Sequence, residues 1–287
     1  MHRYFIAALA CALVAASAFG ARDASAKRSP MVASASVTNG TVINLQSISG
    51  SSLQQVVPGL WGKTLSGNSQ AAAALIEISS VRAHRHNETA EFIYVLSGSA
   101  RVTMGSRSAA VSAGDFVYLP KGIPHSVQAT DGKVKVLAVE VPPMIAGDMH
   151  YMSTSMDSSM NAGASGMAGS VTHVQGISDN SLQRLIPGVW SKTLANNTRA
   201  AASLTEFSTV RPHWHNRVSH FYYVLDGSAQ LTVGHRTTNV GAGDFVYITK
   251  GVTHSIRSNG RKIKILTFAI PPLPNTDMHY PTSTSMR

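Results

Sequence analysis

The feature that most constrains the fold of this chain is an internal repeat. The segment PGLWGKTL, which contains Trp61, recurs as PGVWSKTL around Trp190, and GDFVYLPKG recurs as GDFVYITKG. Members of each pair are 129 positions apart, so residues 41–151 align with residues 170–280 without a gap, and about half of the aligned positions are identical. Self-similarity of this extent indicates two copies of one structural unit. The sequence therefore predicts two tandem domains with these boundaries.

Within each copy the apolar residues alternate with a period of two. Segments such as EFIYVLSG, DFVYL and KVKVLAVEV are short and rich in Val, Ile, Tyr and Phe, and turns that contain Gly, Asp, Asn or Pro separate them. No amphipathic helical stretch longer than about one turn interrupts these segments, which argues against a parallel sheet with crossover helices. The pattern predicts an all-β sandwich or barrel in each copy.

The segments outside the two copies differ from them in composition. Residues 1–26 combine a basic start with an apolar run that is too short to span a bilayer, which is typical of a cleavable signal peptide. We therefore expect a secreted or periplasmic protein. Residues 27–40 are predicted to form a flexible leader, residues 152–169 a Ser-, Gly- and Met-rich linker, and residues 281–287 a tail. Thioether ligation of copper(I) by the linker methionines is an alternative interpretation.

Charge and cysteine content narrow the classes of partner. The formal net charge is +10, but the cationic residues are scattered, and the densest pairs are Lys27-Arg28 and Arg261-Lys262. We therefore expect no nucleic-acid partner. The only cysteine, Cys11, lies within the predicted signal peptide, where lipid attachment is the alternative to cleavage. Cleavage after residue 26 leaves a mature chain without cysteine and with a net charge of +9, for which we expect no membrane partner.

Histidine positions recur between the copies and suggest a metal site in each. Copy one contains His84, His86, Glu91 and His125, and the equivalent positions of copy two hold His213, His215, His220 and His254. Residues i and i+2 of a strand point to the same face about 6.6 Å apart, so each His-x-His pair is expected to project into one interior. Imidazoles and a carboxylate suit a divalent first-row metal, and burying them without an ion would be unfavourable. The sequence predicts one divalent metal ion per domain.

These residues also carry a resemblance to a known family. HRHNETAEFIYVLSG followed by GDFVYLPKGIPH resembles the paired motifs of the cupin superfamily, HxHx4Ex6G and Gx5PxGx2H. The second copy is similar, with His220 in place of the glutamate and Thr249 in place of the proline. The resemblance covers residues 41–280 and is greatest to germins and bacterial oxalate decarboxylases. It implies a bicupin, which consists of two tandem jelly-roll β-barrels with a metal site in each bore, and it implies manganese and a homo-oligomer.

The two predicted sites differ in charge. An ionised Glu91 reduces the charge of the first site from +2 to +1, which favours manganese or iron, whereas four neutral histidines leave +2 at the second. The second donor set is compatible with Fe, Cu, Ni, Zn or Mn, and a degenerate second site with a purely structural role is the alternative.

Other residues are candidates for contact with a substrate. Arg82 and Arg211 lie two positions before the first histidine of each copy, so strand alternation directs them into the interior, where they would bind a carboxylate. Hydrogen bonding to backbone carbonyls at the barrel mouth is the alternative. Glu88 is a candidate acid–base group of the first site, and Tyr222 is a candidate proton donor of the second. By the resemblance, oxalate decarboxylases carry their arginine one residue before the positions of Arg82 and Arg211. We also find no equivalent of the acidic lid loop of those enzymes.

The resemblance implies a metal-dependent oxidoreductase, either an oxidase or a dioxygenase, or else a decarboxylase, and we expect it to act on a small carboxylate. A non-catalytic metal- or ligand-binding cupin for storage or scavenging is the first alternative. Sugar binding, which only Trp61, Trp190 and the tyrosines support, is the second. The DMHY segments that begin at Asp148 and Asp277 are expected to close each domain as a strap.

Overall fold

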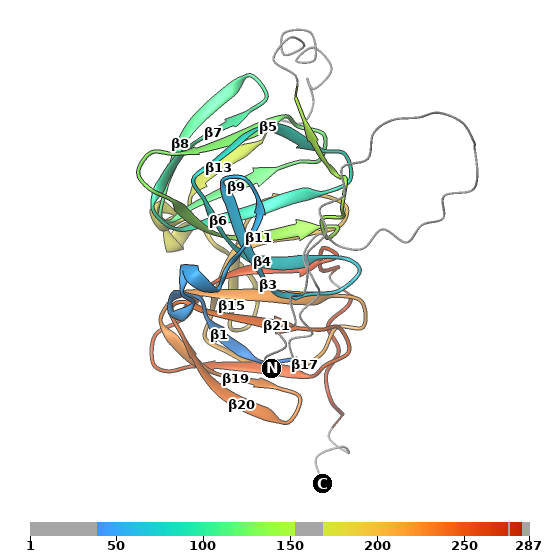
Figure 1. Ribbon diagram of the computed structural model, residues 1–287. Coiled ribbons are helices and arrows are strands. Elements are labelled where there is room, and N and C mark those ends of the chain that lie inside the picture. Colours follow the sequence, from blue (N-terminus) through green and yellow to red (C-terminus); the bar gives the residue numbers. More distant parts are fainter. Residues whose placement is uncertain (1–38, 153–168, 275, 283–287) are drawn as a thin grey trace, which may run out of the picture.

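The computed structural model describes residues 39–152, 169–274 and 276–282, which form an almost purely β structure (Figure 1). The predicted signal peptide with Cys11, most of the leader and tail, and most of the linker, with Met156, Met160 and Met167, lie outside the described residues. In the described part, no helix is long and apolar enough to cross a membrane. The predicted fold class, two tandem jelly-roll β-barrels, is confirmed.

The first barrel consists of two antiparallel sheets. The seven-stranded sheet has the order β13 (Ser170–His173), β9 (Asp115–Leu119), β6 (Ala90–Ser97), β11 (Val134–Val141), β4 (Ala72–Ile78), β3 (Leu60–Gly67), β2 (Gln54–Val57). The five-stranded sheet has the order β12 (Met149–Tyr151), β5 (Ser80–His86), β10 (His125–Ala129), β7 (Ser99–Met104), β8 (Arg107–Ser112). Buried aliphatic side chains such as Val102 and Val136 fill the space between the sheets.

The second barrel repeats this plan. Its seven-stranded sheet has the order β1 (Val42–Asn44), β21 (Asp244–Ile248), β18 (Ser219–Asp226), β23 (Ile263–Ile270), β16 (Ala201–Phe207), β15 (Val189–Asn196), β14 (Gln183–Ile186). Its four-stranded sheet has the order β17 (Thr209–His213), β22 (His254–Ser258), β19 (Ser228–Val233), β20 (Arg236–Gly241). The described helices are short 3-10 turns: η1 (Leu45–Ser47), η2 (Gly50–Ser52), η4 (Val174–Gly176) and η5 (Asp179–Ser181).

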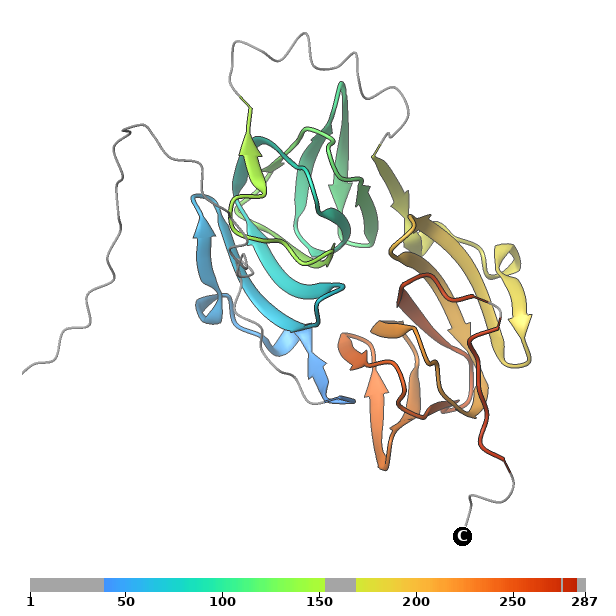
Figure 2. The same cartoon turned by 90° about the vertical axis from the view of Figure 1, so that its right-hand side faces the viewer.

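The two copies exchange their first strands. β1, from copy one, pairs antiparallel with β21 of the second barrel, with Val42 opposite Val246. β13, from copy two, pairs in the same way with β9 of the first barrel, with Val171 opposite Val117. In Figure 2 the blue β1 accordingly lies beside the orange strands, and the olive β13 beside the green ones. Each seven-stranded sheet thus ends in a strand from the other copy.

The outer faces of the two seven-stranded sheets pack against each other and form one buried core. Phe92 and Phe268 are fully buried at this interface with ring centroids 6.5 Å apart, and Tyr94 lies 5.6 Å from Tyr223. Burial of aromatic side chains is strongly stabilising. The core shared between the barrels therefore leaves the inner face of each sheet free to build a site.

Candidate metal centres

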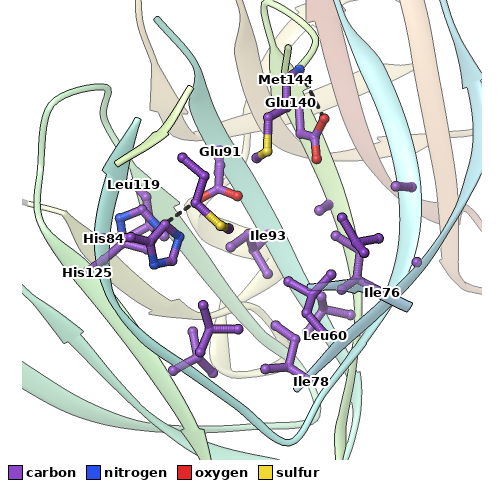
Figure 3. A pocket seen from close by; sticks show the side chains of 18 residues that line it. Leu60, Ile76, Ile78, His84, Glu91, Ile93, Leu119, His125, Glu140 and Met144 are labelled. Carbon is purple, nitrogen blue, oxygen red and sulfur yellow. Dashed lines mark hydrogen bonds and ion pairs between the residues drawn. The ribbon is translucent and has the colours of Figure 1, made fainter. Parts of the chain in front are cut away.

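Two strands of the first barrel bring three imidazoles together. His84 and His86 lie at the end of β5, and His125 begins β10 directly opposite His84 in the register. All three side chains are buried, and one ring nitrogen of each lies within 4.8 Å of those of the other two. Figure 3 shows His84 and His125 at one end of the bore. The i, i+2 spacing thus directs the pair to one face, as the sequence predicted.

The second barrel holds an equivalent triad. His213 ends β17, His215 lies two residues further on, and His254 begins β22. All three side chains are buried, and one ring nitrogen of each lies within 4.8 Å of those of the other two. The ring centroid of His213 lies 5.1 Å from that of His215 and 4.2 Å from that of His254. The equivalent centroid distances in the first barrel are 5.0 Å and 4.2 Å. The repeated sequence thus builds one geometry twice.

The fourth predicted member of each set lies beside its triad. Glu91, on β6, places Oε2 3.2 Å from Nε2 of His125 and 3.9 Å from Nε2 of His86. The ring of His220, on β18, has its centroid 4.9 Å from that of His215. Both side chains are buried. The structure therefore brings all eight predicted ligands together in two clusters of four.

Backbone carbonyls fix the orientation of the imidazoles. Nδ1 of His84 donates to the carbonyl of Arg82 at 2.9 Å, and Nδ1 of His125 donates to the carbonyl of Ile123 at 3.0 Å. The equivalent histidines of the second barrel make the same bonds. A hydrogen bond from Nδ1–H to a backbone carbonyl selects the tautomer in which Nε2 is free to bind a metal. The same hydrogen bond fixes the orientation of the ring.

The DMHY segment holds the turn that follows His86. Asp148 is buried, its carbonyl accepts a hydrogen bond from Nδ1 of His86 at 3.0 Å, and its carboxylate accepts from the backbone N–H groups of Asn87, Glu88 and Thr89 at 2.9–3.2 Å. In the second barrel Asp277 serves His215 and its turn in the same way. The expected strap is thus present, and its orienting aspartate is a contribution that sequence reasoning missed.

Several inward-facing nitrogens have no hydrogen-bond partner. Among the described residues these buried atoms include Nε2 of His86, Nε2 of His254 and both ring nitrogens of His220. A buried polar atom without a partner is destabilising by about 1–3 kcal/mol, and native structures contain few of them. Since these histidine nitrogens belong to the two clusters, the donor sets fit a divalent metal ion.

Burial keeps most of these histidines neutral. Desolvation lowers the pKa of His84 to about 4, with a further contribution from His125, and it lowers the pKa of His213 to about 4 and that of His254 to about 3. Burial also holds the pKa of His220 well below its usual range. Neutral imidazole is the form that binds a metal, so these side chains need no deprotonation at pH 7.

Glu91 and His125 form a buried pair with opposite shifts. Burial alone would raise the pKa of Glu91, but the hydrogen bond with His125 and the charges of the histidines lower it to about 2. Burial alone would lower the pKa of His125, but the bond to Glu91 and its negative charge raise it. The carboxylate is therefore ionised and supplies the negative charge predicted for the first site.

The two bores differ in size and lining. The first cavity measures about 60 Å³ and is lined mainly by apolar side chains such as Ile76, Ile78 and Leu60, as Figure 3 shows. The second measures about 1,070 Å³ and is lined by many more polar groups. Both contain their histidine clusters. The first bore is consequently restricted to very small ligands, whereas the second admits larger ones.

The arginines predicted to face the bore do not line it. A register shift between β5 and β10, where His125 faces His84 but Val127 faces Val81, interrupts the alternation that predicted an inward Arg82. Val81 lines the cavity instead, and Arg82 is exposed with its guanidinium 3.9 Å from the ring centroid of Tyr151. The predicted inward direction of Arg82 was therefore wrong, because the bulge reverses the side-chain direction, whereas its contact with a substrate carboxylate stays a prediction.

Arg211 does not face the second bore either, and the reason is the same. The register of β17 and β22 shifts between Val210 and His213, and Arg211 is exposed over the ring of Tyr280 at 3.7 Å. Val210 takes its place in the lining. Neither barrel therefore has its predicted arginine among the cavity-lining residues in the described part of the chain.

Of the two remaining candidate residues, Glu88 lies outside its cavity and Tyr222 lies inside its cavity. Glu88 is exposed in the turn after β5 and does not line the first cavity, so its predicted acid–base role is not supported by its position. Tyr222 lies where it was predicted, in the second cavity beside His220, with ring centroids 5.4 Å apart. Burial raises the pKa of its phenol. Tyr222 therefore stays protonated and can donate a hydrogen bond at neutral pH.

Sequence reasoning missed a second acidic residue in the first bore. Glu140, on β11, lies opposite Glu91 in the register and lines the cavity. Its Oε2 accepts a hydrogen bond from the backbone N–H of Met144 at 3.2 Å (Figure 3). Burial, with a contribution from the charge of Glu91, raises the pKa of Glu140 to about 7. The signal in the sequence was a single glutamate in the apolar strand KVKVLAVEV, where copy two has Ala269.

Comparison with known proteins agrees with this geometry. The cupin domain family matches residues 77–141 and 206–270. An oxalate decarboxylase of Bacillus subtilis is 25% identical over 232 residues, which cover 62% of this chain and 60% of that relative. The alignment thus spans less than two thirds of the length of that enzyme.

Solved structures show the same fold. A cupin 2 conserved barrel domain protein from Leptotrichia buccalis superposes with a TM-score of 0.60 at 13% identity, covering 84% of this chain and 99% of that one. An oxalate decarboxylase from Lactobacillus farciminis, in a formate complex, superposes with a TM-score of 0.53 at 18% identity, covering 85% and 89%. At these identities the likeness concerns the fold alone.

Proposed function

Because the chain is a bicupin of the cupin superfamily, we propose that it is a secreted metal-dependent enzyme that oxidises or decarboxylates a small carboxylate. The observation that carries the proposal is the buried set of His84, His86, Glu91 and His125, whose inward atoms converge at one end of a bore. The similarity to an oxalate decarboxylase supports the class of substrate. The segment 1–26 supports secretion.

The residues of the first bore suit a small acid. A divalent ion held there would supply an electrophilic centre and, for a redox-active metal such as manganese or iron, one-electron chemistry. Ile76, Ile78 and Leu60 give the cavity an apolar lining, which strengthens electrostatic interactions inside it. Glu140 supplies a carboxyl group on the cavity wall that can hold a proton beside a bound ligand.

The metals differ between the sites in this proposal. Manganese occupies the first, where Glu91 adds a hard oxygen donor and a negative charge. The second site, with His220 in the equivalent position, takes Fe, Cu, Ni or Zn, which imidazole suits, or else Mn as in the first site. We propose a homo-oligomeric assembly on the basis of family resemblance alone.

Metal analysis and a turnover assay test the proposal together. We expect about two metal ions per mature chain, and release of CO₂ or H₂O₂ from oxalate or another small acid, measured with and without O₂. Less than one ion per chain, or no turnover across C2 to C4 acids by fully loaded protein, would refute it. A matched pair of variants, Glu91→Ala and His220→Ala, assigns the activity to a barrel.

One observation favours a non-catalytic alternative. The exposure of Arg82 and Arg211 leaves both bores without the predicted carboxylate clamp. A cupin that stores or scavenges metal has no need of such a clamp. Full metal loading without turnover would support this alternative. Trp61 and Trp190 are not among the residues lining either described cavity. Their positions therefore do not support the sugar binding considered from the sequence.

A further inference from the structure

The inner walls of the two barrels differ in a consistent way. Five positions that are apolar in the first cavity carry a hydroxyl group in the second, and both members of each pair line their cavities. The pairs are Gly62 and Ser191, Ala74 and Ser203, Ile76 and Thr205, Ile93 and Tyr222, Ala138 and Thr267. A barrel that needed only a packed apolar wall would gain nothing from these hydroxyls, since buried polar groups require partners.

The hydroxyls form an ordered row across four neighbouring strands. Tyr222 of β18 lies opposite Thr267 of β23, Thr267 lies opposite Ser203 of β16, and Ser203 lies opposite Thr193 of β15. All four residues line the cavity. Adjacent strands are about 4.8 Å apart, so the row extends about 14 Å across the sheet. It begins beside the histidine cluster, because the ring of Tyr222 lies 5.4 Å from that of His220.

Part of this hydrogen-bonding capacity is unused within the protein. Oγ1 of Thr267 is buried and has no hydrogen-bond partner among the described residues. Thr205 and Ser191, which form a second pair across the sheet, share a hydrogen bond of 3.0 Å. Hydroxyl groups both donate and accept, so they match a ligand that also carries hydroxyl groups. Thr267 lines the second cavity, so its unpartnered hydroxyl is available to such a ligand, whereas the equally unpartnered Oγ1 of Thr64 belongs to a residue that does not line the first cavity.

The volume and charge of the bore define the ligand further. About 1,070 Å³ is far more than a two-carbon acid occupies. Four imidazole ligands add no negative charge to a divalent ion, and no residue lining this cavity in the described part of the chain is acidic. The histidine end of the bore therefore attracts an anion, while the wall provides hydroxyls.

We propose that the second barrel binds a polyhydroxylated organic acid of the sugar-acid class. Its carboxylate lies at the histidine end, and its hydroxyls bond to the row that contains Thr267 and Ser203 and to the pair of Thr205 and Ser191. The inference rests on the proposed metal in the second site, but not on turnover of a small acid in the first. The two barrels then serve ligands of different size.

The test uses three six-carbon probes and the full mature chain loaded with metal. D-gluconate has both a carboxylate and hydroxyls, hexanoate has only the carboxylate, and sorbitol has only the hydroxyls. We expect calorimetric titration to show one gluconate site per chain, at least tenfold tighter than either of the other probes. Equal affinity for hexanoate would overturn the proposal, because the apolar part of the wall would then provide the recognition.

Variants locate the site. The near-isosteric pair Thr205→Val and Thr267→Val removes two hydroxyls, and we expect gluconate affinity to fall at least tenfold with unchanged metal content. Thr64→Val is the matched control, because it removes the first-barrel counterpart of Thr193, and we expect no change. Unaltered gluconate binding by the double variant would overturn the proposal.

The metal content of the protein distinguishes a failure of the sugar-acid assignment from a failure of the proposed function. Absence of gluconate binding in a protein that holds both ions overturns only the sugar-acid assignment and leaves the proposed function standing. Less than one ion per chain overturns both.

Discussion

The raised pKa of Glu140 predicts a specific pH dependence of stability. The pKa rises from 4.5 to about 7 when the side chain is buried beside Glu91. A shift of about 2.5 pKa units corresponds to about 3 kcal/mol of the free energy of unfolding. Since the folded pKa is the higher one, this stabilisation of the native state is fully present below pH 4.5 and is lost as the pH rises through about 7.

Glu140→Gln removes the titration while keeping the size of the side chain and an oxygen that can accept from Met144. Urea unfolding of the metal-free protein is measured at pH 5 and at pH 8 for wild type and variant. We expect wild type to lose about 2 kcal/mol more stability than the variant over this range, since part of the 3 kcal/mol is already lost at pH 5. Taking the difference cancels the contribution of titrating groups that do not interact with Glu140.

Glu88→Gln is the control, because it removes an exposed carboxylate from the same barrel. Its stability profile should follow that of wild type, since exposed charges contribute little. The reasoning is refuted if Glu140→Gln and wild type lose the same stability between pH 5 and pH 8. Such a result would show that Glu140 is solvated in the metal-free protein and titrates in its ordinary range.

Three further predictions concern the sites and the shared core. Glu91→Ala should remove the metal from the first barrel and leave the second loaded, so elemental analysis should fall from two ions per chain to one; equal loss from both would show that the sites are not independent. Asp148→Ala should weaken metal binding in the first barrel by about 10–100-fold in a chelator competition, because the turn after His86 loses three backbone partners. Phe268→Ala should lower the free energy of unfolding by about 3–5 kcal/mol in urea, because it opens a cavity between the barrels; a loss below about 1 kcal/mol would contradict a shared core.

The parts of the fold and site that local rules determine were predictable from the sequence. Strand alternation placed His84 and His86 on one face, and the gapless repeat then placed His213 and His215 in the same way. Period-two patterning with frequent turns predicted the all-β architecture. These features depend on neighbours within a few residues, which a single sequence displays.

The features that were missed depend on pairing between distant segments. The bulge that turns Arg82 outward appears only when β5 is registered against β10, since the segment SVRAHRH reads as a regular strand by itself. The exchange of β1 and β13 is likewise a property of the pairing, not of their composition. Glu140 could have been singled out as a charged residue in an apolar strand, but its position opposite Glu91 required the register of β11 and β6.

The division of each seven-stranded sheet into two faces explains how two copies of one sequence acquire different chemistry. On the faces buried between the barrels the copies retain most of their residues, as Phe92 and Phe221 show, although Val139 corresponds to Phe268. On the inner faces the copies diverge: Glu140 becomes Ala269, and Ile76 becomes Thr205. Because successive side chains of a strand point to opposite faces, an inner residue can change without disturbing the contact between the barrels. The shared core thus fixes the architecture, while each bore is free to adapt to its own ligand.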